Sequence, residues 1–123
     1  LNQLYTASST CVLTNLTANM RGTGYMQTNT SIGPLVINTS GTVNLYSGGG
    51  VTITCTTCTM TAGTLDFWNG STITCSSTFT YSGGSLVNMG AINCTTFTVA
   101  GANFTYYGGL ITPSVSFVIT SGS

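Results

Sequence analysis

Apolar residues in the middle of the chain recur in pairs, with one residue between the two members. The segment 51–70 holds three such pairs, and the segments 71–90 and 91–109 repeat the arrangement. Side chains alternate between the two faces of a β-strand, so each pair predicts a short strand with two inward side chains. The pairs are Ile53 with Cys55, Cys58 with Met60, Leu65 with Phe67, Ile73 with Cys75, Phe79 with Tyr81, Val87 with Met89, Ile92 with Cys94, Phe97 with Val99 and Phe104 with Tyr106.

The repeat extends towards the N-terminus with less regularity. The sequence TSGTVNLY at 39–46 matches TAGTLDFW at 61–68, which places a further repeat at 32–50. The N-terminal segment 1–30 fits poorly. We therefore divide the chain into this segment and a repetitive β domain at 31–123.

A period of about 20 residues is typical of stacked supersecondary units. Three strands per period predict an all-β fold, a β-helix or solenoid whose coils seal one another's apolar residues. The alternative is an antiparallel β-sandwich, pilin-like or immunoglobulin-like with a donated strand, because Asn69-Gly70 is a strong hairpin signal. The sandwich gives no reason for three pairs to recur in phase, so the sequence favours the β-helix.

One alternating stretch lies outside the clear repeats. Val12, Leu16, Ala18 and Met20 are apolar residues at alternate positions of this stretch. The pattern is that of a strand that completes a neighbour's sheet, and equally that of a first strand capping the domain. Both interpretations remain open.

Cysteine placement follows the repeat. Stacked coils bring Cys55, Cys75 and Cys94 into one internal ladder of small buried side chains. The spacing of Cys55 and Cys58 also occurs in zinc and redox sites, but the chain has no His and no expected helix, so we predict no metal. Cys11 is a candidate for pairing with Cys58 or with another subunit.

Threonine also recurs with the coils. Thr52-x-Thr54-x-Thr56 returns as Thr72-x-Thr74-x-Ser76, facing outward on a β-helix. Such ladders resemble the ice-binding faces of insect antifreeze proteins. The plainer interpretation is that Thr is a good strand former with a neutral surface.

Aromatic residues mark the predicted corners of the coils, at Tyr46, Trp68, Tyr106 and Tyr107. Exposed rings of this kind stack on sugars in carbohydrate-binding adhesins. They also cover the edges of a core or a subunit contact.

Charge is nearly absent. Arg21 and Asp66 are the only charged residues, which make up 2% of the chain, and there is no His. Nucleic-acid binding requires several cations, and acid–base catalysis requires titratable groups, so we expect no nucleic-acid partner, no catalytic residues, no enzyme activity and no cofactor. No apolar run is long enough to span a membrane.

Bound sugar can replace charge as the source of solubility. Acceptor sequences for N-glycosylation occur at six positions, namely Asn15, Asn29, Asn38, Asn69, Asn93 and Asn103. A coat of covalent glycans on a secreted protein is the functional interpretation, and chance occurrence accounts for some of the six.

In this composition the chain resembles the subunits of archaeal surface pili and threads, which are poor in charge, rich in Ser, Thr and Asn, and heavily N-glycosylated. The resemblance implies an extracellular filament subunit at the cell surface. Threads use a donated strand in a pilin-like sandwich, so the resemblance also supports the second fold.

The sequence thus favours a structural protein. A solenoid without charged caps exposes a sheet edge that invites another copy, and head-to-tail contacts build open fibres. We expect a homopolymer of secreted, N-glycosylated subunits. A carbohydrate-binding adhesin or fibre tip and an ice-binding protein are the alternatives.

Overall fold

The computed structural model describes the backbone of residues 11–13, 16–18, 23–26, 30–45, 50–87, 90–101, 104 and 109–121. Within these ranges it describes the side chains from residue 31 onwards, apart from those of Thr39 and Asn69.

The described elements are strands, joined at one corner by a short 3-10 turn. The strands are β1 Cys11–Leu13, β2 Leu16–Ala18, β3 Thr23–Met26, β4 Thr30–Ile32, β5 Leu35–Leu45, β6 Thr52–Cys55, β7 Cys58–Phe67, β8 Thr72–Cys75, β9 Thr78–Tyr81, β10 Ser85–Val87, β11 Ala91–Ala100 and β12 Leu110–Ser121, and the turn η1 is Trp68–Gly70. Every strand pair in the described part of the chain is parallel.

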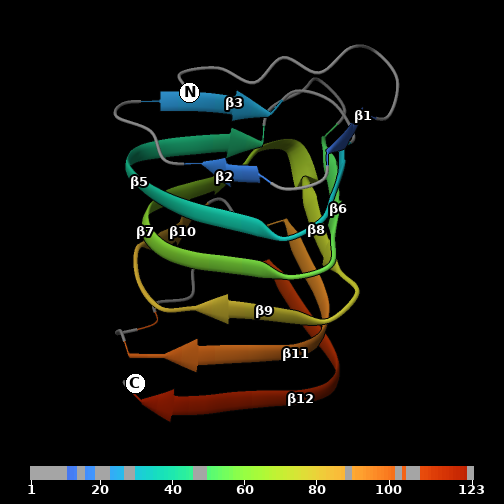
Figure 1. Cartoon of the computed structure of the whole chain (residues 1–123), viewed down its shortest axis with the longest axis vertical. Coiled ribbons are helices and arrows are strands. Elements are labelled where there is room, and N and C mark those ends of the chain that lie inside the picture. The colour runs from blue at the N-terminus through green and yellow to red at the C-terminus, as the bar shows by residue number, and fades with distance from the viewer. Residues whose placement is uncertain are drawn as a thin grey trace.

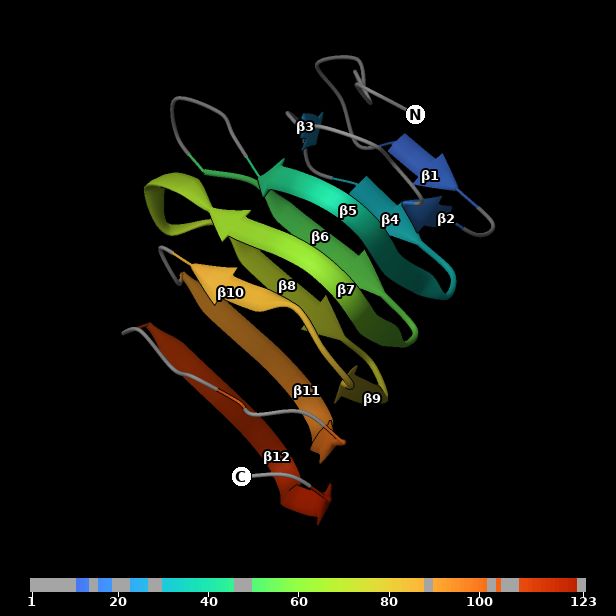
Figure 2. The same cartoon turned by 90° about the vertical axis from the view of Figure 1, so that its left-hand side faces the viewer.

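The parallel strands stack in about four turns of a β-solenoid, with β1 to β3 at one end and β12 at the other (Figure 1). Three faces surround the core (Figure 2). The first face consists of β1, β4, β6, β8 and the first halves of β11 and β12. The second consists of β2, β9, the first halves of β5 and β7, and the second halves of β11 and β12. The third consists of β3, β10 and the second halves of β5 and β7. The predicted β-helix is confirmed.

The sandwich alternative is wrong, and the Asn69-Gly70 signal shows why. Its backbone forms η1 at a corner, and the next strand, β8, pairs in parallel with β6 of the preceding coil. Gly70 has a φ of 71°, in the left-handed region that glycine favours. The dipeptide therefore turns the chain into the next coil instead of reversing it into a hairpin.

The register of the coils agrees with the sequence match at 39–46. Thr42 to Leu45 of β5 lie opposite Thr64 to Phe67 of β7, residue for residue. Ile53 lies opposite Ile73, and Ile73 opposite Ile92. Successive coils therefore bury equivalent side chains at equivalent positions.

One predicted inward pair is wrong. Leu86, not Val87, is buried, because Leu86 lies in register with Leu65 of the coil before it. Val87 lies opposite the outward-facing Asp66 and is half-buried. The other member of that pair, Met89, and Tyr106 of the last predicted pair lie outside the described residues.

The core is a continuous apolar column inside the three faces. Phe79 and Phe97 stack with ring centroids 5.2 Å apart and an interplanar angle of 9°. Phe97 and Phe117 repeat the arrangement at 5.2 Å and 16°. Phe104 packs against this column edge-on to Tyr81, with centroids 5.0 Å apart. Aromatic stacking thus follows directly from placing the same residue type in successive coils.

Candidate functional site: the open end of the solenoid

Large apolar side chains are exposed mainly on the last strand. On β12, Leu110 is 59% exposed, Val115 74%, Phe117 48% and Ile119 58%, and the fifth exposed large apolar residue of the described chain is Trp68. Four of the five therefore lie on one strand at one end of the molecule. This concentration is unlike the scattered single apolar residues of an ordinary protein surface.

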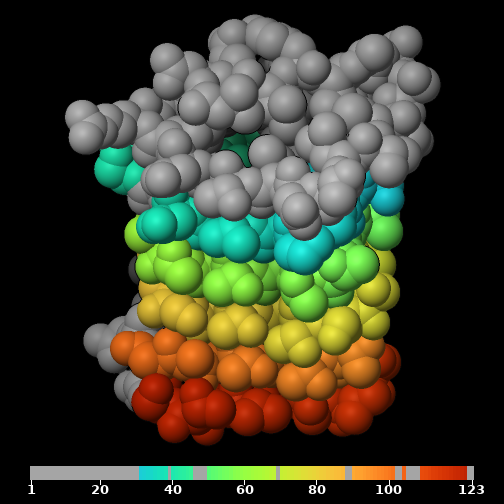
Figure 3. Space-filling view, viewed as in Figure 1, coloured from blue at the N-terminus to red at the C-terminus, as the bar shows by residue number. Residues whose placement is uncertain are grey.

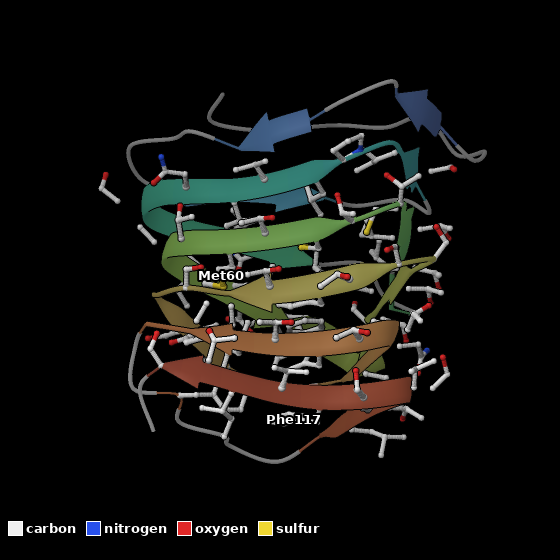
Figure 4. All side chains as sticks on the ribbon, turned by 60° about the horizontal axis from the view of Figure 1, so that its bottom comes forward. Met60 and Phe117 are labelled. Atoms are coloured by element: carbon white, nitrogen blue, oxygen red, sulfur yellow. The ribbon has the colours of Figure 1, made fainter. Side chains whose placement is uncertain are left out.

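The exposure arises because core positions continue into β12. Phe117 lies opposite Phe97 and Ile119 opposite Val99, and both of those residues are fully buried. In the described part of the chain no strand follows on the other side of β12. Phe117 therefore stands at the end of the stack that Figure 4 brings forward. We call the surface formed by Ile111, Phe117, Ile119 and the outer edge of β12 the open end.

The backbone of β12 is also available for pairing along part of its length. From Ser116 to Ile119 its register with β11 is regular, while irregularities occur between Cys94 and Thr96 and after Val99. Bulges and proline normally blunt sheet edges, and Pro113 lies opposite Cys94. The run 116–119 lacks such interruption, and β12 carries no charged residue.

At the opposite end, the strand candidates for donation are already paired within the chain. Val12 of β1 lies opposite Ser31 of β4, and Leu16 and Ala18 of β2 lie opposite Leu35 and Ile37 of β5. Met20 lies outside the described residues. Donation of these strands to a neighbour would require them to leave the first coil.

The cysteines lie in the core. Cys55 and Cys75 are register partners with their sulfur atoms 3.2 Å apart, and Cys94 is buried on the next coil. Cys58 is also fully buried. The side chain of Cys11 lies outside the described residues, so its pairing with Cys58 stays a prediction.

The thiols of Cys55, Cys75 and Cys94 are held in their protonated form. The hydrogen bond to Cys75, together with burial, raises the pKa of Cys55. The same bond lowers the pKa of Cys75, but interaction with Cys58 and burial outweigh it, so the net direction is upward. Burial raises the pKa of Cys94, against a smaller lowering by the Phe79 backbone. Thiolate is the reactive form, so these sulfur atoms suit packing rather than redox chemistry.

Asp66 is the one acidic residue of the chain, and its register partners Asn44 and Val87 are neutral. Among the described residues no group of three or more His, Cys, Asp or Glu side chains is placed to hold a metal ion. Asp66 lies opposite Asn44 on the third face, and Trp68 donates its indole N–H to the Asn44 side-chain oxygen at 3.2 Å. This cluster consists of one carboxylate among neutral groups. Tyr46, Tyr106 and Tyr107 lie outside the described residues.

Two glycosylation candidates have described side chains. Asn38, on β5, is exposed, and Asn93, on β11, is half-buried between Thr74 and Thr112. The side chains of Asn15, Asn29, Asn69 and Asn103 lie outside the described part. Asn38 and Asn93 are on the sides of the solenoid; Asn93 lies in the layer next to β12, whereas Asn38, on β5, lies farther from the open end.

The threonine ladder is more extensive than the sequence analysis suggested. On the first face Thr52 lies opposite Thr72 and Thr54 opposite Thr74, but the next coil presents Ala91 at the first of these positions. The second face carries Thr-x-Thr on three consecutive coils, which the 20-residue period did not predict. The signal was present in the sequence as T-C-T, T-F-T and T-F-T, centred on Cys58, Phe79 and Phe97.

No protein-family model, no curated protein and no solved structure matches this chain. In the described residues no helix is long and apolar enough to cross a membrane.

Proposed function

We propose that the protein is a structural subunit of an extracellular, N-glycosylated filament, in which copies stack head to tail. The open end is the observation that carries this proposal. Its apolar side chains occupy core positions, and its strand edge runs parallel to every other layer. A further copy would cover both features at once.

The geometry favours an open fibre over a closed dimer. The end formed by β12 differs from the end formed by β1 to β3, so a contact between them is heterologous. Heterologous contacts that do not close into a ring propagate as filaments. Stacking in the direction of the solenoid axis would also continue the column of Phe79, Phe97 and Phe117.

The energetics require both kinds of contact. Phe117 is 48% exposed and Ile119 58%, so covering what remains accessible contributes, for each residue, roughly half of the about 1.5–3 kcal/mol for burying a whole side chain. Association costs at least about 4 kcal/mol in lost freedom of movement. The two side chains therefore do not offset this cost by themselves. Backbone hydrogen bonds at the β12 edge, each contributing about 0.5–1.5 kcal/mol, supply the remainder.

A neutral surface and glycans fit the same arrangement. Without charge, the sides of neighbouring subunits neither repel nor attract strongly, and neutral proteins tend to precipitate. A glycan on the exposed Asn38 would keep the sides soluble while leaving the open end uncovered. This supports growth along the axis rather than lateral clumping.

Electron microscopy and sedimentation of the purified protein over a range of concentrations test the proposal. We expect filaments that lengthen with concentration for the wild type and monomers for Phe117→Asp, because a charge at the open end would be buried without a partner. The matched control is Val118→Asp, which adds the same charge at the adjacent residue, whose side chain points to the outward side of β12.

The control is expected to assemble as the wild type does. A wild-type protein that stays monomeric at every concentration would overturn the proposal. Equal loss of assembly in the two variants, with both folded by circular dichroism, would mean that the open end is not the contact.

A further inference from the structure

The second face carries a regular array of threonines. Thr59 of β7 lies opposite Thr80 of β9, which lies opposite Thr98 of β11. Thr78 and Thr96 form a second row. Thr57, directly before β7, precedes the Cys58–Phe79 register pair just as Thr78 does. We call these six residues the threonine face: Thr57, Thr59, Thr78, Thr80, Thr96 and Thr98.

The array is spaced by the sheet itself. Neighbouring strands lie about 4.8 Å apart, and alternate residues of a strand lie about 6.6 Å apart. The strands that carry the face lie one below another in Figure 1, and the space-filling view in Figure 3 shows the layers as parallel bands. The result is a two-dimensional grid of identical side chains with a fixed repeat in both directions.

The grid is rigid because the core supports it. The residues between and beside these threonines point inward and are fully or almost fully buried, for example Cys58, Phe79 and Phe97. Threonine is β-branched, so its χ1 angle is restricted. Each methyl and hydroxyl group therefore keeps its place in the grid without a further loss of conformational entropy on binding.

The hydroxyl groups are available to a ligand. Within the described residues the side-chain hydroxyls of Thr59, Thr80 and Thr98 have no hydrogen-bond partner. Thr96 shares a hydrogen bond with Ser116 at 3.2 Å, at the border of the face. Every threonine of the face is half-buried, so each side chain remains partly accessible to solvent.

The chemistry of the face indicates which ligand it fits. The outward positions of the grid hold no charged and no aromatic residue. The row formed by Thr59, Thr80 and Thr98 ends at Val36 on one side and at Val118 on the other. Exposed rings are the usual platform for sugars, and in the described part of the chain the exposed aromatic residues, Trp68 and Phe117, lie elsewhere. A grid of methyl and hydroxyl groups instead matches a surface of regularly spaced water molecules.

From this we infer that the threonine face binds ice. Water held between the methyl rows and hydrogen-bonded to the hydroxyls would take up the repeat of the grid, about 4.8 Å by about 6.6 Å. A layer of water ordered in this way can join the regular lattice of an ice surface. The ligand is thus a crystal surface, and adsorption to it would slow the growth of ice. This activity does not depend on filament assembly, since the face lies along the side of the solenoid.

The first face provides a built-in comparison. Its outer row runs Thr52, Thr72, Ala91 and Leu110, so its threonine rows are interrupted after two coils. Thr74 on this face and Thr80 on the threonine face are both half-buried threonines in the middle of a strand. They form a matched pair for substitution.

Thermal hysteresis and inhibition of ice recrystallisation test the inference. We expect both activities in the wild type. Thr80→Tyr should lose them severalfold, because the tyrosine ring would stand above the surrounding threonines. Thr74→Tyr should retain them. Phe117→Asp, which leaves the face intact, should also retain activity. Thr80→Val, which keeps the shape and removes one hydroxyl, serves if the tyrosine variant fails to fold by circular dichroism.

Three results would overturn the inference. The first is a wild-type protein without either activity. The second is equal activity in the folded Thr80 and Thr74 variants, or greater loss in the Thr74 variant. The third is binding of the wild type to microcrystalline cellulose that Thr80→Tyr abolishes, because the face would then be a polysaccharide site.

Discussion

Ser71 shows how one polar side chain holds a corner of the solenoid together. It is buried, accepts a hydrogen bond from the Val51 N–H at 2.9 Å, and lies 2.6 Å from the Trp68 carbonyl and 3.0 Å from the Leu45 carbonyl. These three partners come from two earlier coils. The residue therefore links layers through its side chain as well as through its backbone.

Replacing Ser71 by Ala should destabilise the protein by about 1–3 kcal/mol, because the Val51 N–H would be left buried without an acceptor. Chemical denaturation measures the loss. Ser76→Ala, at an exposed corner position, is the control and should change little. An unchanged denaturation midpoint for the Ser71 variant would show that another group or water replaces the hydroxyl.

The paired thiols predict how stability depends on pH. The pKa values of Cys55 and Cys75 are raised in the folded protein above the ordinary value of 9.0. Below that value both states hold the protons and the contribution to stability is complete. As the pH rises above about 9, only the unfolded chain releases them, so the free energy of unfolding falls by about 1.4 kcal/mol per pH unit for each thiol.

Denaturation under reducing conditions between neutral pH and about pH 10 checks this expectation. The double variant Cys55→Ala, Cys75→Ala should lose stability less steeply over the same interval, whatever its stability at neutral pH. The same alkaline slope in both proteins would mean that these thiols are not protonated more strongly in the fold than in the unfolded chain.

At the scale of single residues, the sequence predicted inward and outward positions well where the pattern was unambiguous. Ile53, Cys55 and Met60 are buried as expected. Alternation failed at Ser85 to Met89, because both Leu86 and Val87 are apolar and begin alternative pairs. The register with Leu65 decides between them, and that is a contact with another coil that local alternation does not contain.

Among the elements, the aromatic column makes a prediction about position in the stack. Phe97 is fully buried with a ring on each side, whereas Phe117 has one neighbour in the column and is half exposed. Phe97→Ala should therefore cost about 3–5 kcal/mol, and Phe117→Ala much less in the monomer. Thermal unfolding of dilute protein measures both, and equal losses would contradict the stacked arrangement.

Corners were harder to predict than strands. Thr52 and Thr72 are register partners 20 residues apart, while Cys58 and Phe79 are 21 apart. The difference arises at the corner, because two residues separate Cys55 from Cys58 and three residues separate Cys75 from Phe79, the equivalent positions of the next coil. Such a change leaves every strand intact and shifts only the numbering. For this reason the sequence indicated the period but hid the threonine face, which becomes regular only when each face is aligned separately.

On the scale of the whole molecule, the sequence indicated the solenoid because stacking is the arrangement that puts three apolar pairs in phase. It did not locate the open end on particular residues. Ile111 and Phe117 carry the same pattern as the buried coils, and they are only partly buried because no strand among the described residues lies beyond β12. Assembly and ice binding use different surfaces, the end and one side, so they can be tested separately.

The constant register between coils makes the length of the molecule adjustable. The strands of each layer pair only with strands of the layers before and after it, so copying one coil of about 20 residues would insert a complete new layer between strands whose pairing repeats. Every duplication would lengthen the body by about 4.8 Å, the spacing between strands. It would also add one more threonine to each row of the threonine face. In a chain built in this way, internal gene duplication can set both the length of the solenoid and the area of the threonine face in equal steps.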